Sequence, residues 1–155
     1  MMIMKPIVFF LFILFFSNDF VFCMKSENDN SFCKNDSCDI QNLVKIQNNI
    51  DSLTEVEIKN FLSMFDGRCI NNVEYSEFSN EILYFILSHN KVNLLIKVLS
   101  KSKKLLVKEV MEAIENPIND QIDLSKTYEN VKKARGCKKT QGMILKSINI
   151  AKSKM

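Results

Sequence analysis

At 155 residues the chain is short enough for a single globular domain, and its net charge at pH 7 is a modest +3. The charge is uneven: residues 24–90 carry 5 lysines and arginines against 11 aspartates and glutamates, whereas residues 91–155 carry 15 against 6. Arginine occurs only at Arg68 and Arg135, and the lysines gather at predicted helix ends and connectors. This composition argues against nucleic-acid binding, which favours basic residues clustered on one face.

The first residues are typical of a secretory signal peptide. Lys5 precedes an apolar run from Pro6 to Phe16, and polar residues end that run before it is long enough to cross a bilayer. Val21 and Cys23 suit a signal peptidase that cuts after Cys23. We therefore predict that residues 1–23 are removed and that the mature protein is secreted or periplasmic, with no stable membrane anchor. The alternatives are a lipid anchor on Cys23 and an uncleaved leader.

Four cysteines remain after such a cut, namely Cys33, Cys38, Cys69 and Cys137. An even number in a chain bound for an oxidising compartment predicts two disulfides, and the sequence does not choose among the three possible pairings. Zinc is the rival interpretation. Zinc sites usually present closely spaced pairs of cysteine or histidine, and only His89 is available to complete the widely separated second pair.

Residues 24–50 are predicted to be a polar, cysteine-containing N-terminal segment, and residues 51–155 a helical domain. From Leu53 onward the apolar residues recur at helical spacing, and no useful length shows the alternation of a strand. Thr54 and Glu57 form a capping box at the start of the first helix. The six predicted helices begin at Thr54, Asn72, near Val92, near Lys104, near Asp123 and near Thr140.

The sequence therefore predicts an all-α fold, a single domain of about six antiparallel helices. Mostly short connections favour neighbours that run in opposite directions. Two architectures fit this pattern, a compact bundle and a short α-solenoid of helical hairpins. No repeated residue pattern distinguishes them.

The stretch MFDGRCINNVEYSEF begins at Met64, and with its flanking helices it makes residues 53–87 resemble an EF-hand, the helix-loop-helix that binds calcium. If Asp66 takes the first loop position, then Glu74 falls at the ninth and Glu77 at the twelfth, where EF-hands place a bidentate glutamate. In the resemblance, these three carboxylates are the metal ligands of an ion-responsive alternative.

The first half of that loop departs from the EF-hand pattern. Arg68 and Ile70 occupy two positions where the family places oxygen ligands, and Asn71 replaces the expected glycine. No second loop of the chain supplies a partner. The resemblance is therefore to a degenerate EF-hand, and we expect that this loop holds no calcium.

No catalytic set or cofactor motif is visible, and His89 is the only histidine. An uncharacterised enzyme is accordingly the last of the three functional hypotheses. The first is a small exported protein that binds another protein, as an inhibitor, an immunity-type protein or an adaptor, with an acidic surface as the expected target. The predicted partner-binding residues are Lys101, Lys103, Lys104, Lys132, Lys133, Lys138 and Lys139.

Overall fold

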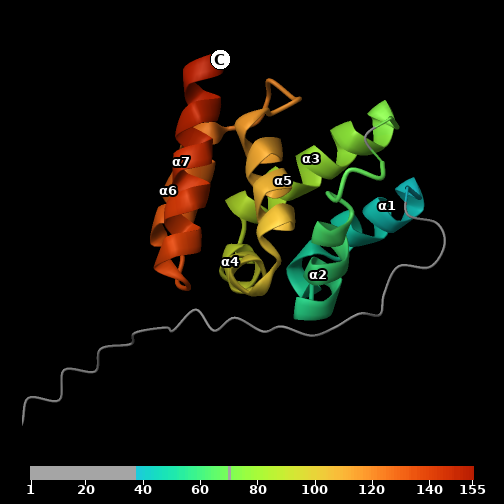
Figure 1. Cartoon of the computed structure of the whole chain (residues 1–155), viewed down its shortest axis with the longest axis horizontal. Helices are drawn as coiled ribbons and strands as arrows, with labels where there is room; N and C mark the ends of the chain where they lie inside the picture. Colours follow the sequence, from blue (N-terminus) through green and yellow to red (C-terminus); the bar gives the residue numbers. More distant parts are fainter. Residues whose placement is uncertain (1–37, 70) are drawn as a thin grey trace, which may run out of the picture.

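The computed structural model describes residues 38–69 and 71–155. Within these residues the chain forms only helices, and no strand is present. The elements are α1 (Ile40–Asn48), the short 3-10 helix η1 (Ile50–Ser52), α2 (Glu55–Ser63), α3 (Val73–Ser88), α4 (Val92–Lys101), α5 (Lys104–Glu115), α6 (Leu124–Lys133) and α7 (Lys138–Lys154). The all-α prediction is confirmed (Figure 1).

Polar caps fix where α2, α3 and α6 begin. Thr54 Oγ1 accepts a hydrogen bond from the Glu57 backbone N–H, while the Glu57 carboxylate accepts one from the Thr54 N–H, so the predicted capping box is present. Asn72 caps α3 and Asp123 caps α6 in the same way, each with a side-chain oxygen that accepts from a first-turn N–H. These caps satisfy donors that a helix start would otherwise leave unpaired.

Helix α1 lies inside the range 24–50, where the sequence predicts a polar segment, and the helical part of the chain therefore begins earlier than expected. Asp39 caps this helix, and Leu43 is fully buried against the rest of the core. Ile40 and Ile46 pack partly on the same core. The helix has only nine residues, four of them apolar, and so short a helix is marginal by itself. Its packing on α3 decides its conformation.

Helix α3 is the centre of the domain. It packs against α1, α4, α5 and α6, and its residues Leu83, Ile86 and Leu87 are fully buried. The C-terminal helix α7 then packs on both α5 and α6. In a solenoid each repeat contacts only its neighbours. Contacts from one helix to four others therefore fit the compact bundle.

A disulfide joins Cys38, just before α1, to Cys69 in the loop between α2 and α3, with a Cα–Cα distance of 5.7 Å. Cys137 is disulfide-bonded as well, while Cys33 lies outside the described residues. The pairing of Cys38 with Cys69 excludes the one between Cys33 and Cys38. A disulfide fits an oxidising compartment, such as the extracellular space or the periplasm.

The helices within the described residues have at most 17 residues each, whereas a helix needs about 20 mostly apolar residues to cross a bilayer. No single helix among them is long and apolar enough to cross a bilayer. Helices α3 and α4 reach the required length and composition only when taken together, and the chain bends by 113° between them.

Candidate functional site

The seven predicted partner-binding lysines lie at one end of the bundle, called the lysine-rich end below. Lys101, Lys103 and Lys104 surround the connector from α4 to α5, and the other four surround the connector from α6 to α7. Both connectors lie at the lower side of the molecule in Figure 1, with α4 beside them. All seven residues are exposed. Two lysine groups that are separate in the sequence thus lie on the same side of the molecule in this view.

Helix α4 links the two groups through its contacts with the second connector. The Asn93 side-chain oxygen accepts a hydrogen bond of 2.7 Å from the Arg135 backbone N–H. Beside it, Gly136 has a φ of +151°, and a Cβ at this position would lie 2.8 Å from Cγ2 of Ile96. Only glycine tolerates both this backbone conformation and this close approach. Gly136 therefore lets the connector lie directly against α4.

Gln141 in the first turn of α7 holds the same connector from the other side. Its side chain is buried, and its Nε2 group donates to the backbone carbonyls of Val131 at 2.8 Å and Ala134 at 3.0 Å. These carbonyls belong to the end of α6, where helical partners are missing. Sequence reasoning missed Gln141, because one glutamine near a helix start gives no signal of such a role.

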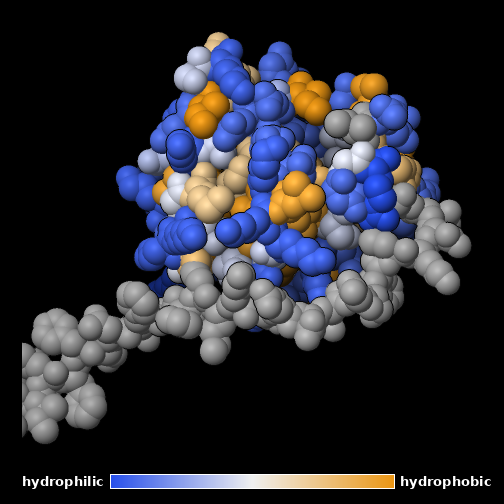
Figure 2. All heavy atoms as spheres, viewed as in Figure 1, coloured by the Kyte–Doolittle hydropathy of each residue, from blue (hydrophilic) through white to orange (hydrophobic). Residues whose placement is uncertain are grey.

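Among the described residues, few of the lysines at the lysine-rich end are paired with a carboxylate. Lys101 pairs with Glu55 at 3.1 Å, and Lys132 lies 3.8 Å from Glu129. Within residues 38–69 and 71–155, the other five lysines form no ion pair; they are Lys103, Lys104, Lys133, Lys138 and Lys139. The coloured part of the face in Figure 2 is largely hydrophilic, with separate hydrophobic patches.

In the EF-hand-like loop, the first candidate calcium ligand, Asp66, interacts with Arg68 of the same loop. Asp66 Oδ1 accepts hydrogen bonds from the backbone N–H and from Nε of Arg68, at 3.2 and 2.8 Å. The guanidinium thus engages the carboxylate that would be the first calcium ligand. Glu74 and Glu77, the other two candidates, are exposed on α3. Among the described residues, no group of three or more His, Cys, Asp or Glu side chains is arranged to hold a metal ion.

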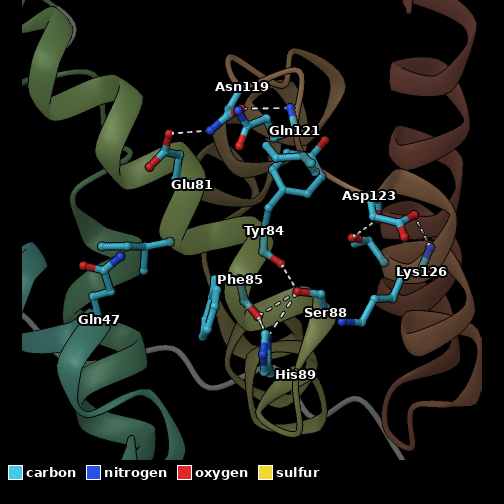
Figure 3. A pocket seen from close by; sticks show the side chains of 13 residues that line it. Gln47, Glu81, Tyr84, Phe85, Ser88, His89, Asn119, Gln121, Asp123 and Lys126 are labelled. Atoms are coloured by element: carbon cyan, nitrogen blue, oxygen red, sulfur yellow. Dashed lines mark hydrogen bonds between the residues drawn. The ribbon is translucent and has the colours of Figure 1, made fainter.

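A shallow cleft of about 330 Å³ lies between α1, α3 and the start of α6. Its polar groups hold the fold together: Glu81 accepts from the Asn119 amide at 2.8 Å, and Asp123 caps α6. His89 lies 2.7 Å from the Phe85 carbonyl through Nδ1, and its ring stacks on the Phe85 ring (Figure 3). Ser88 Oγ lies 3.2 Å from His89 Nδ1, and the same hydroxyl is within hydrogen-bond distance of the Tyr84 and Phe85 carbonyls at 2.9 and 3.1 Å. Both side chains therefore interact with the C-terminal end of α3.

Comparison with protein-family models, with curated proteins and with solved structures found no match for this chain. The fold and the disulfide define an all-α, single-domain protein. Its function must accordingly be argued from its own surface.

Proposed function

We propose that this is an exported protein that acts by binding an acidic surface of another protein through its lysine-rich end. One observation carries the proposal: two lysine groups about 30 residues apart in the sequence lie at the same end of the bundle, one at the C-terminal end of α4 and the other beside its N-terminal half. Five of the seven ammonium groups have no carboxylate partner within the described chain. A patch of one sign speeds encounter with an oppositely charged surface and makes the association sensitive to salt.

Export supports the same proposal. The leader predicted at residues 1–23 and the disulfide between Cys38 and Cys69 both fit a protein that works outside the cytoplasm. An inhibitor, an immunity-type protein or an adaptor acts through surface complementarity, and none of these roles needs a catalytic pocket. The binding partner belongs to the same compartment.

The test is affinity capture from the native extracytoplasmic fraction at low and at high salt, with wild type and with Lys103, Lys104, Lys138 and Lys139 changed to glutamate. We expect wild type to capture a partner at low salt, with weaker capture at high salt and almost none by the charge-reversed variant. A matched control reverses four exposed lysines outside the lysine-rich end, which are Lys59, Lys126, Lys146 and Lys152.

The control variant changes the net charge equally but leaves the lysine-rich end intact, so it should retain the partner. If both variants lose the partner to the same degree, the total charge matters and the location does not. If the variant with the reversed lysine-rich end captures as much as wild type, the lysines are an ordinary solvated surface and the proposal is wrong.

A further inference from the structure

Two of the most exposed large hydrophobic residues lie at the lysine-rich end. Val56 in the first turn of α2 is 66% exposed, and Leu105 in the first turn of α5 is 67% exposed. They are called the apolar pair below. Leu105 directly follows Lys103 and Lys104 in the sequence. Single exposed apolar residues are common and need no explanation, but here two of them accompany a patch of unpaired lysines.

Ion pairs bring the first turn of α2 to the same place. Glu55, next to Val56, binds the ammonium groups of Lys97 at 2.5 Å and Lys101 at 3.1 Å. Helix α2 also packs directly on α5. Val56 and Leu105 therefore both stand within one helical turn of the junction where α2, α4 and α5 meet. The lysines of α5 lie beside this junction.

From this arrangement we propose that the lysine-rich end binds an acidic amphipathic segment of a protein, whose apolar side chains cover the apolar pair while its carboxylates face the lysines. The inference rests on the proposed function and adds the chemistry of the partner. Protein interfaces commonly have an apolar centre within a polar, charged rim. The apolar contact would give affinity that persists in salt, and the lysines would set the orientation and the rate of encounter.

The Glu55 carboxylate favours a protein segment over an anionic lipid surface. Its side chain remains 39% exposed between the two lysines that it binds, and it stands beside Val56. A lipid surface rich in negative headgroups would have to compete with the ion pairs that Glu55 already makes with Lys97 and Lys101. A peptide has discrete acidic positions, so its carboxylates can contact the lysines and avoid Glu55.

Two synthetic acidic peptides of equal charge and length test the inference. One carries leucines at helical spacing, and the other has serine in their place. We expect the full mature protein to bind the leucine peptide about tenfold more tightly, which is the gain from burying one large apolar side chain. In a Val56→Ser, Leu105→Ser variant the two peptides should bind with equal, salt-sensitive affinity. An Ile118→Ser variant is the control, because Ile118 is 51% exposed in the connector at the opposite end.

The other possible results separate failure of this inference from failure of the proposed function. Equal affinities for the two peptides in wild type overturn this inference and leave the proposed function standing. Failure of both peptides to bind, at low salt as well, argues against the inference and against the electrostatic basis of the proposed function. Binding of wild type to vesicles of phosphatidylcholine and phosphatidylserine, with loss in the Val56→Ser, Leu105→Ser variant, would assign the surface to lipid instead. Retained melting temperatures show that the variants are folded.

Discussion

Gly136 lies where the chain leaves α6 and passes close to α4, with a φ in the region that favours glycine. Changing Gly136 to alanine should destabilise the protein by about 2 kcal/mol or more. Alanine would be strained at this backbone conformation, and its Cβ would also clash with the Ile96 side chain. Denaturant unfolding monitored by circular dichroism measures the difference. Four lysines of the lysine-rich end flank the altered connector, so partner binding should also weaken.

Two other glycines are controls for that experiment. Gly67 has a φ of +85° with no atom near the position of a Cβ, so alanine there should cost only the backbone strain, about 1 kcal/mol. Gly142 lies inside α7 with open space around it, and alanine should stabilise that helix by roughly 0.5–1 kcal/mol. If all three variants lose the same stability, the contact with Ile96 is not important.

The buried tyrosines predict how stability depends on pH. Burial raises the pKa of Tyr75 to about 12 and raises the pKa of Tyr84 as well. A raised pKa means that the folded state favours the neutral phenol, so its contribution is complete below the ordinary pKa of about 10. That contribution is lost as the pH rises from about 10 through the folded-state pKa values.

The free energy of unfolding should therefore decline above about pH 10, with a slope of up to about 1.4 kcal/mol per pH unit for each of the two groups. A Tyr75→Phe variant removes one ionisable group and should flatten the decline. Denaturant titrations across this range give the two curves, and identical slopes for wild type and variant would contradict the assignment to Tyr75.

At the scale of elements, local chemistry was enough to place most helices. The predicted capping box at Thr54 is a short-range signal that the structure confirms, and α3 and α6 begin directly after Asn72 and Asp123, close to the predicted starts. The sequence does not predict helix α1, because a helix of only nine residues is marginal by itself and depends on its contacts with α3. The pairing of Cys38 with Cys69 was equally beyond the sequence, since it depends on how α1 returns to the loop after α2.

That disulfide gives a prediction for α1. Changing Cys38 and Cys69 together to serine should lower the free energy of unfolding by about 3 kcal/mol, as expected for a crosslink that spans 31 residues. Hydrogen exchange should show the loss of protection concentrated in α1, because this helix is held mainly by the disulfide and by α3. A uniform loss of protection over all helices, or no loss, would show that the disulfide does not specifically stabilise α1.

At the scale of the whole molecule, the sequence revealed the lysines but not their arrangement. Lys101–Lys104 and Lys132–Lys139 are separate groups in the chain, and they lie at the same end because α4 packs on α7 and contacts the connector before it. No local pattern encodes that packing. Similarly, the loop at Asp66 has the spacing of a calcium site, but only the structure shows the Arg68 guanidinium on the first carboxylate.

The mature covalent structure is the last prediction. Intact mass of the protein recovered outside the cytoplasm should correspond to a chain that begins at Met24, with no free thiol under denaturing conditions. Because Cys38 and Cys69 are joined and Cys137 is also bonded, such a chain leaves Cys33 as the partner of Cys137. Peptide mapping checks this pairing. A peptide that joins Cys137 to Cys23 would show that the cut does not fall after Cys23.

The disulfide between Cys38 and Cys69 also determines whether proteolytic cleavage separates the chain into two pieces. The exposed residues Asp66–Arg68 lie inside the covalent ring that this bond closes, so cleavage there opens the ring without separating its two halves. Both pieces would stay attached and could remain packed on α3. A nicked molecule would thus gain only the mass of one water molecule and keep its lysine-rich end, and its two pieces would separate only after reduction.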